Sequence, residues 1–303
     1  TTDIYTLSLH DALPIFIIDG NKAAEAVYSE MRIKIDQMEN RDHFTPGVAI
    51  IMVGNDPSSK VYVNMIVKNC EALSIKANVY DFDENASTDV VVDQIKQLNE
   101  DCSYCGIIVQ FPVPKHLNAL AIREAISPEK DVDSAGSANI GKFYATNDCY
   151  VPCTPKGMHR LLKSLNVPLT GKHAVVIGRS HVVGKPIADM LLNENMTVTV
   201  CHSKTVDLGS YTRQADVIMA GAGVAHLITA DMVKPGAIVI DAGINVLNNK
   251  LVGDVDTDAV QDVASAITPV PGGVGPMTIA MLIENIMMAC TSVYCSCKVK
   301  TEL

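Results

Sequence analysis

The chain has 303 residues and a formal net charge of −10, and 48% of its residues are hydrophobic. A chain of this length and apolar content can bury one large core or two of ordinary size. The acidic balance disfavours nucleic acid as a partner, because there is no basic stripe that would neutralise phosphates. From the sequence we expect no apolar run long enough to span a bilayer. The first 21 residues contain no Lys or Arg, so we also expect no targeting signal. Both expectations indicate a cytoplasmic protein.

The nine cysteines are odd in number and irregularly spaced, which is typical of reduced thiols rather than of a disulfide framework. The pairs Cys102/Cys105 and Cys149/Cys153 have spacings that a metal site can use. Neither pair is matched by a second pair or by histidines at zinc spacing. We therefore expect structural cysteines and no metal.

Apolar runs and helical periodicities alternate along the first half of the chain. They predict helices over 21–39, 60–73 and 88–99 and strands over 47–53, 77–82 and 106–111. The run from Asn55 to Ser59 predicts a turn that caps the second helix. Strands that alternate with helices indicate an α/β domain with a parallel sheet.

A similar alternation follows Pro155. It predicts helices over 156–165 and 208–215, strands over 197–201, 216–220 and 237–241, and a last helix from Pro276 to about residue 290. We interpret the chain as two α/β domains, one of residues 16–155 with about 276–303 and one of Rossmann type over 156–275. Residues 1–15 follow neither pattern and are set aside as an artefact or a disordered tail.

The segment from Lys172 to Leu192 predicts a buried strand, a glycine turn and an amphipathic helix. The turn runs from Gly178 to Gly184, with Arg179 and Ser180 beside the first glycine. Such a turn places a pyrophosphate at a helix N-terminus, where free N–H groups and the helix dipole favour negative charge. Because the glycine spacing is not GxGxxG, the flanking strand and helix carry the prediction of a dinucleotide site.

The end of the next predicted strand favours NADP over NAD. Domains that bind NAD usually place Asp or Glu there to bind the ribose 2′-hydroxyl. Residues 201–205 contain no carboxylate but include Ser203 and Lys204. Together with Arg179 they could bind a 2′-phosphate, which a carboxylate would repel. The alternative is that these are solvated surface residues.

Short motifs that begin at Val53, Val109, Lys130, Pro152, Gly178, Cys201 and Pro269 fall in order along the chain. From about residue 16 to residue 290 the chain resembles the bifunctional methylenetetrahydrofolate dehydrogenase/methenyltetrahydrofolate cyclohydrolase family. The resemblance implies a homodimer of two-domain subunits with a folate cleft between the domains. It implies oxidation of 5,10-methylenetetrahydrofolate by NADP⁺ and hydrolysis of the methenyl product to 10-formyltetrahydrofolate.

The resemblance also gives individual residues roles. Tyr62 would stack on the folate, Gln110 would lie beside the catalytic position, and Asp133 would hydrogen-bond the pterin. Further substrate-binding residues would be Val109, Phe111, Pro271, Gly272, Gly273, Val274 and Gly275. Cofactor-binding residues would be Gly178, Arg179, Ser180, Ser203 and Ile244. Without the resemblance, Tyr62 would be a core helix residue, Gln110 a strand-end cap and Asp133 an N-cap.

The sequence departs from the family at one catalytic position. The family has a lysine one helical turn after the tyrosine, as the acid/base group of the cyclohydrolase step, and here that position holds Ile66. Lys68 is a poor substitute, because six residues at about 100° each place it roughly 240° around the helix from Tyr62. Isoleucine cannot transfer a proton, whereas hydride transfer has no obligatory proton step on the protein. A smaller departure is Ser134, where a glycine is usual and where a positive φ would make serine unfavourable.

Three functions follow from these observations. The first is an NADP-dependent methylenetetrahydrofolate dehydrogenase with weak or absent cyclohydrolase activity. The second is the ordinary bifunctional enzyme, in which another group or a water transfers the proton. The third is a catalytically impaired protein that binds folate and nucleotide.

Overall fold

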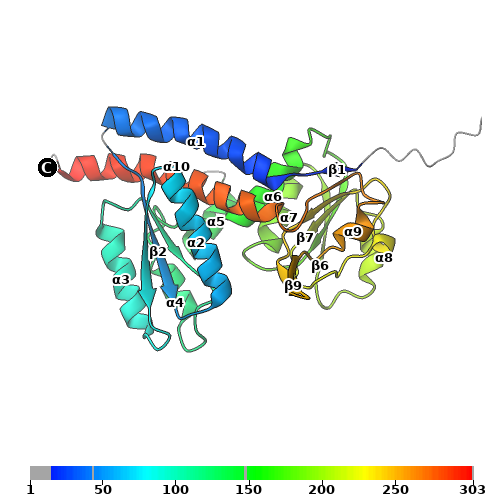
Figure 1. Cartoon of the computed structure of the whole chain (residues 1–303), viewed down its shortest axis with the longest axis horizontal. Helices are drawn as coiled ribbons and strands as arrows, with labels where there is room; N and C mark the ends of the chain where they lie inside the picture. Colours follow the sequence, from blue (N-terminus) through cyan, green and yellow to red (C-terminus); the bar gives the residue numbers. More distant parts are fainter. Residues whose placement is uncertain (1–14, 43, 147–148, 302–303) are drawn as a thin grey trace, which may run out of the picture. The chain divides into compact units, whose positions relative to one another are not determined.

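The computed structural model describes residues 15–42, 44–146 and 149–301, and its helices and strands are labelled in Figure 1. The chain forms two compact units. One comprises the described residues up to Gly20 together with Met158–Gly275, and the other comprises Asn21–Gly157 and the described residues from Pro276 onward. Each unit contains a parallel sheet, of six strands in the first and three in the second, so we call them the six-stranded and three-stranded units.

The first residues of the described chain belong to the six-stranded unit, whereas the sequence assigned residues 16–20 to the other domain. Strand β1 (Phe16–Ile17) pairs in parallel with β11 (Ala266–Ile267) of that unit. Ile15, which the sequence set aside with the tail, packs against the core of the same unit. A strand of two residues has no periodicity, so only the tertiary pairing identifies it. Residues 1–14 of the segment that was set aside lie outside the described residues.

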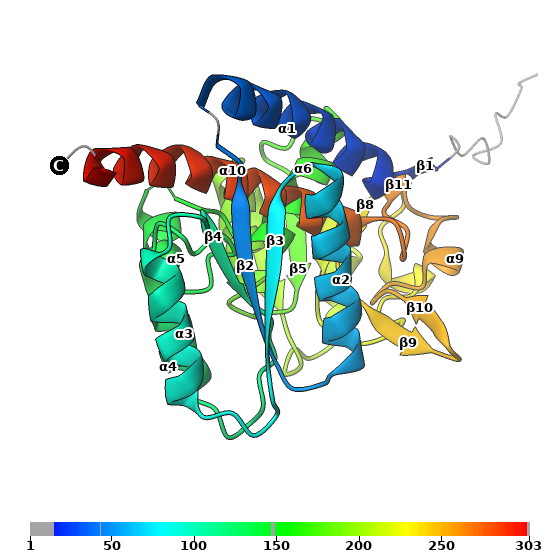
Figure 2. The same ribbon diagram turned by 60° about the vertical axis from the view of Figure 1, so that its left-hand side comes forward.

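The three-stranded unit is built from βα repeats whose strands lie in the order β3-β2-β4. All residues of the central strand are buried, as expected for an apolar run in a parallel sheet that is covered on both faces. Figures 1 and 2 show α2 on one side of this sheet and α3 on the other. The elements are α1 (Gly20–Asp42), β2 (Gly47–Val53), α2 (Pro57–Ala72), β3 (Lys76–Phe82), α3 (Thr88–Glu100), β4 (Gly106–Val109), α4 (Ala119–Glu124) and α5 (Ser137–Ala145).

Helix α10 (Val274–Thr301) is the longest helix of the described chain. By length and composition its segment Val274–Ser292 could cross a membrane, which corrects the expectation that no apolar run is long enough. However, 72% of this segment is buried inside the protein. Its apolar surface is therefore covered by protein, and the segment is weak evidence for a membrane span. At Gly157 of α6 (Cys153–Ser164), a Cβ atom would lie 3.1 Å from Met277 Cβ, so the two helices pack closely.

The six-stranded sheet has the order β1-β11-β8-β7-β5-β6. The chain leaves β5 first to one side, for β6, and then returns to the other side, for β7. The reversal creates a topological switch point between β5 and β7, where doubly wound folds bind ligands at the carboxyl ends of the strands. The elements are β5 (His173–Ile177), α7 (Gly184–Asn193), β6 (Thr197–Cys201), α8 (Leu208–Thr212), β7 (Val217–Ala220), a 3₁₀ turn (Ala230–Met232), β8 (Ile238–Asp241), β9 (Asn245–Leu247), β10 (Lys250–Val252) and α9 (Thr257–Val260).

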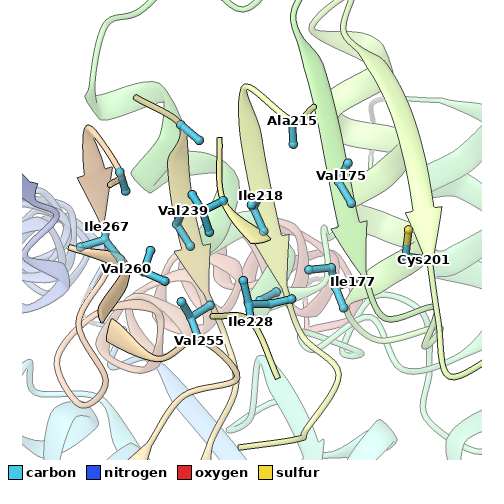
Figure 3. Close-up of a cluster of buried hydrophobic side chains, with 14 residues drawn as sticks. Val175, Ile177, Cys201, Ala215, Ile218, Ile228, Val239, Val255, Val260 and Ile267 are labelled. Carbon is cyan, nitrogen blue, oxygen red and sulfur yellow. The ribbon is translucent and has the colours of Figure 1, made fainter. Parts of the chain in front are cut away.

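A cluster of buried apolar side chains covers one face of this sheet, as Figure 3 shows. Alternate residues of a strand supply it: Val175 and Ile177 come from β5, and Ile218 and Ala220 from β7. Val255 and Val260, beyond the hairpin of β9 and β10, complete the layer from outside the sheet. The apolar runs predicted as buried strands therefore form the core of a doubly wound sheet.

One described cysteine differs from the expectation of reduced thiols. Cys102 is disulfide-bonded, whereas Cys70, Cys105, Cys149, Cys153, Cys201 and Cys290 are free. Irregular spacing cannot reveal which cysteines the fold brings together, and this is why the sequence missed the bond.

We expect Ile51→Ala to destabilise the three-stranded unit by about 2–5 kcal/mol, because Ile51 is fully buried in the central strand and its truncation leaves a cavity. Val61→Ala is the control, since Val61 is 60% exposed on α2. Urea denaturation followed by circular dichroism measures both. Equal stabilities of the two variants would contradict the packing described here.

Candidate active site

The start of α2 fixes the position of the predicted substrate residues on that helix. Asp56 is its N-cap and accepts a 2.7 Å hydrogen bond from the backbone N–H of Ser59, and Pro57 occupies the first turn. This bond lowers the pKa of Asp56. The predicted capping turn is confirmed. It places Tyr62 and Ile66 one turn apart on the same side of the helix.

Ile66 is fully buried, while Lys68 is exposed. The two side chains therefore face different environments, as the helical geometry predicts. A side chain at position 66 is therefore enclosed by protein, whereas the side chain of Lys68 is not.

The loop that carries Asp133 is held by its other polar residues. Lys130 is buried and its Nζ donates to the carbonyls of Leu98, at 2.9 Å, and Asp101, at 2.7 Å. Asp131 is also buried and accepts from the backbone N–H groups of Ala135 and Gly136. Asp131, rather than Asp133, therefore binds the amides of this turn-rich loop.

Ser134 has a φ of 55°, in the left-handed region where glycine is favoured. The serine here is thus in a strained backbone conformation. Its Oγ donates to the carbonyl of Tyr150 at 2.9 Å, which offsets part of the strain.

Asp133, Tyr62 and Cys153 form an electrostatic cluster. Cys153 lies beside the carboxyl group of Asp133, and its Sγ donates to the neighbouring carbonyl of Val132 at 3.8 Å. Burial raises the pKa of Asp133 to about 6, and the neighbouring Cys153 thiol opposes this shift. Burial also raises the pKa of Tyr62, and the charge of Asp133 adds to this shift. The structure thus brings together two residues predicted from the sequence, and adds Cys153, which the sequence treated only as a structural cysteine.

Asn285 of α10 is fully buried and connects the Asp133 loop to the segment around Cys153. Its Nδ2 donates to the carbonyls of Val132, at 2.8 Å, and Val151, at 2.9 Å. Its Oδ1 accepts from Lys156 Nζ at 2.8 Å, and the same ammonium lies 2.8 Å from Glu284 Oε2. No sequence pattern links Asn285 to residues so distant in the chain, so this contact was missed.

Gln110 and Phe111 follow β4 directly, because the strand ends at Val109, two residues before its predicted end. The Nε2 of Gln110 donates to the carbonyl of Phe111 at 2.9 Å. The guanidinium carbon of Arg123 lies 4.3 Å from the ring centroid of Phe111. Arg123 also lowers the pKa of Asp133, so this cation lies near both Phe111 and the Asp133 cluster. The sequence gave Arg123 no role.

In the six-stranded unit, the turn after β5 has the tight geometry predicted for a nucleotide site. Gly178 has a φ of 117°, and a Cβ atom there would lie 2.4 Å from the carbonyl oxygen of Gly221. A Cβ atom at Gly184 would lie 2.2 Å from the carbonyl oxygen of Gly178. Ser180 Oγ accepts from the N–H groups of Val183, at 3.1 Å, and Gly184, at 3.4 Å, where the turn enters α7. Both glycines are therefore required by close backbone contacts.

Polar and apolar side chains are exposed around this turn. Arg179 is exposed beside Gly178, and Ser203 and Lys204 are exposed in the turn that follows β6. Ile244 is 68% exposed between β8 and β9. The N–H of Lys204 donates to His202 Nδ1 at 3.1 Å, and no carboxylate occurs from Cys201 to Thr205. This edge of the sheet presents cations and hydroxyls to an anionic ligand.

The run Pro271–Gly275 belongs to the six-stranded unit, whereas Tyr62, Ile66, Val109, Gln110, Phe111 and Asp133 belong to the three-stranded unit. Gly272 has a φ of 102°. Gly273 is buried, and a Cβ atom on it would lie 2.5 Å from the carbonyl oxygen of Pro269. Val274 is also buried, while Pro271 and Gly275 are exposed. Close contacts therefore require glycine at position 273.

Comparisons with known proteins identify both halves of the chain. Residues 18–133 match the family model described as tetrahydrofolate dehydrogenase/cyclohydrolase, catalytic domain. Residues 152–294 match the model of its NAD(P)-binding domain. The bifunctional protein FolD of Cupriavidus necator is 47% identical over 278 residues, which cover 91% of this chain and 98% of that protein.

Solved structures agree with this match. The bifunctional FolD enzyme, methylenetetrahydrofolate dehydrogenase/cyclohydrolase, of Campylobacter jejuni superposes with a TM-score of 0.89 at 44% identity, over 92% of this chain and 99% of that one. The dehydrogenase-cyclohydrolase of Trypanosoma brucei, solved with NADP and an inhibitor, has a TM-score of 0.89 at 34% identity over 92% and 98% of the two chains.

We expect Asn285→Asp to lower the free energy of unfolding by about 2–4 kcal/mol, because the carbonyls of Val132 and Val151 each lose a buried donor. Asn99→Asp is the matched control. Its Nδ2 donates to one carbonyl, that of Ala125, and its Oδ1 still accepts from the N–H of Ser127 after substitution. Chemical denaturation compares the two variants, and an equal loss in both would count against the Asn285 network.

Proposed function

Because the chain belongs to the tetrahydrofolate dehydrogenase/cyclohydrolase family, we propose that it oxidises 5,10-methylenetetrahydrofolate to 5,10-methenyltetrahydrofolate with NADP⁺ as the hydride acceptor. The observation that carries the proposal is the glycine turn at the switch point of a doubly wound sheet, in a chain that matches both domains of the family. Hydride transfer requires little from a protein beyond the face-to-face positioning of two rings.

The cofactor-binding residues would be those around the turn after β5. The backbone of Gly178, Arg179 and Ser180 would approach the pyrophosphate, and Ile244 would line the site. The exposed cations and hydroxyls of Arg179, Ser203 and Lys204 suit a 2′-phosphate, and the absence of a carboxylate after β6 removes the usual partner of an NAD ribose. When bound, the nicotinamide supplies the electron-accepting ring.

The folate would be bound by the cluster in the three-stranded unit. Tyr62 supplies an aromatic face for stacking. The carboxylate of Asp133 can accept from the amino and ring N–H groups of the pterin, and Gln110 supplies a nearby amide. Val109 and Phe111 would line the same pocket, and the family resemblance implies that the run Pro271–Gly275 also binds substrate.

The hydrolysis of the methenyl product lacks the family's acid/base group, because Ile66 cannot donate or accept a proton. General acid–base catalysis is typically worth about 10²–10⁴-fold in rate. In the cluster, burial raises the pKa of Asp133 to about 6, and Cys153 lies beside its carboxyl group. It is mostly ionised near neutrality, as pterin binding requires. We therefore propose a dehydrogenase with weak or absent cyclohydrolase activity.

A spectrophotometric assay tests this proposal. With 5,10-methylenetetrahydrofolate we expect NADPH to form while the methenyl absorbance accumulates, and NADP⁺ to have a lower KM than NAD⁺. Comparable rates of both steps would mean that another group or a water replaces the missing lysine. If neither step occurs but the protein still binds folate and nucleotide, it is a catalytically impaired binding protein.

Ile66→Lys should raise the cyclohydrolase rate by about 10²-fold or more and leave the dehydrogenase rate within a few-fold, because it restores an acid/base group one turn from Tyr62. Met65→Lys is the control, since Met65 is 43% exposed on α2. It should leave both rates unchanged. Retained dehydrogenase activity shows that the variant is folded, so a folded variant without a cyclohydrolase gain would refute the role of position 66.

We also propose that the protein is a homodimer, and its exposed hairpin offers an apolar surface. Val246 of β9 pairs directly with Leu251 of β10, and these side chains are 71% and 49% exposed. Side chains of directly paired residues lie on the same face.

The double variant Val246→Asp/Leu251→Asp should be monomeric by analytical ultracentrifugation, while Val206→Asp, at an 85% exposed site, should remain dimeric. A monomeric wild-type protein would contradict the dimer, and a dimeric double variant would contradict this surface.

A further inference from the structure

Asp254 is a fully buried carboxylate in the six-stranded unit, just beyond β10. Its Oδ2 accepts from the N–H groups of Ala222, at 2.5 Å, and Gly223, at 3.0 Å. Its Oδ1 accepts from the N–H of Val224, at 2.9 Å, and from Asn245 Nδ2, at 2.9 Å. Three consecutive backbone amides therefore bind one carboxyl group.

The segment that Asp254 binds follows β7 and lies at the switch point of the sheet. β7 is the direct neighbour of β5, with Ala220 opposite Ile177, so both chain segments leave the sheet side by side. The carbonyl oxygen of Gly221 is the atom that a Cβ on Gly178 would meet. Residues 221–224 thus form one wall of the crevice in which a doubly wound fold binds a dinucleotide, and the glycine turn after β5 forms the other.

The surrounding chain is built to admit the carboxylate. A Cβ atom at Gly243 would lie 2.3 Å from Asp254 Oδ1. A second buried carboxylate, Asp241, accepts from the N–H groups of Gly243 and Val255, both at 2.8 Å. It therefore fixes the glycine that contacts Asp254 and the residue that follows Asp254. A Cβ atom at Gly253 would in turn lie 1.9 Å from Asp241 Oδ2. Glycine at 243 and at 253 is therefore required by the two carboxylates.

If Asp254 only stabilised the unit, it would not need to bind a loop at the switch point. Asp254 instead accepts hydrogen bonds from the N–H groups of Ala222, Gly223 and Val224. These amides are therefore directed inward, and the conformation of the loop is set before any ligand binds. Gly223 has a φ of 70°, and apart from Gly223 and its two chain neighbours no described residue has an atom within 4 Å of the position that a Cβ would take there. The backbone conformation, and not crowding, therefore favours glycine at position 223.

We propose that Asp254 is a positioning residue of the nucleotide site, which preorganises the 222–224 wall for a nicotinamide dinucleotide. This inference rests on the proposed use of NADP. Asp254 does not itself contact the nucleotide, because its oxygen atoms accept hydrogen bonds from the loop. Preorganisation lowers the ordering that binding would otherwise require, so its loss should appear in nucleotide affinity rather than in chemistry.

Asp254→Asn tests the proposal, because it keeps the shape of the side chain but turns an N–H₂ group toward backbone N–H donors. We expect the Kd for NADPH, measured by fluorescence titration, and the KM for NADP⁺ to rise about 10- to 100-fold. The kcat and the KM for the folate should stay within about two-fold of wild type. Asp216→Asn is the matched control. Asp216 accepts from the N–H of His173 and from Lys234 Nζ at the opposite end of the same sheet, so its loss should leave the Kd for NADPH unchanged.

The outcomes separate this inference from the proposed function. A wild-type protein that does not bind NADPH overturns the proposed cofactor, and the inference with it. Wild-type binding with an unchanged Kd in folded Asp254→Asn overturns the positioning role alone. If Asp254→Asn does not fold, Gly223→Val decides, because it disfavours the same loop conformation without touching the carboxylate. An unchanged Kd in that variant also overturns the positioning role.

Discussion

Hydrogen bonds from backbone amides to buried carboxylates hold the loops on which both candidate sites depend. Asp131 binds two amides of the loop that carries Asp133, and Asp254 binds three at the switch point of the larger sheet. A buried charge is unfavourable unless it is satisfied, and hydrogen bonds to a charged group are worth about 1.5–3 kcal/mol each. Besides the three backbone amides, Asp254 accepts from the side-chain amide of Asn245. The backbone therefore provides most of the compensating dipoles, and the loop must keep one conformation to do so.

The elements that the sequence predicted are those with a strong local pattern. The apolar run at 47–53 is a fully buried central strand, and the turn before α2 is capped by Asp56 as expected. The hairpin of β9 and β10 was missed although Asn248 and Asn249, both with positive φ, form its turn. Asparagine tolerates the positive φ that tight hairpin turns require, so this pair was a usable signal. β1 and β11 have two residues each and are identified by their tertiary pairing, so no local pattern could have predicted them.

The candidate sites divide in the same way. The glycine turn could be predicted from its strand and helix, and the structure supplies its reason, which is the contact between Gly178 and Gly221. The proximity of Tyr62 and Asp133 could be expected only from the family resemblance. Asn285 binds the carbonyl of Val132 across 153 positions of sequence. Such a contact depends on how α10 packs, which neither periodicity nor a motif encodes.

The substitution at position 66 separates two kinds of chemistry that the family combines. Hydride transfer depends on where two rings lie, and the residues that would position them are retained, from Tyr62 to the glycine turn. Proton transfer depends on a group of suitable pKa, and a fully buried isoleucine supplies none. If Asp133 binds the pterin as proposed, its oxygen atoms accept from the pterin N–H groups and are not free to replace the lysine as an acid/base group. Burial raises the pKa of Asp133 to about 6, so its carboxyl group is mostly ionised at neutrality, which suits a group that accepts hydrogen bonds from a pterin.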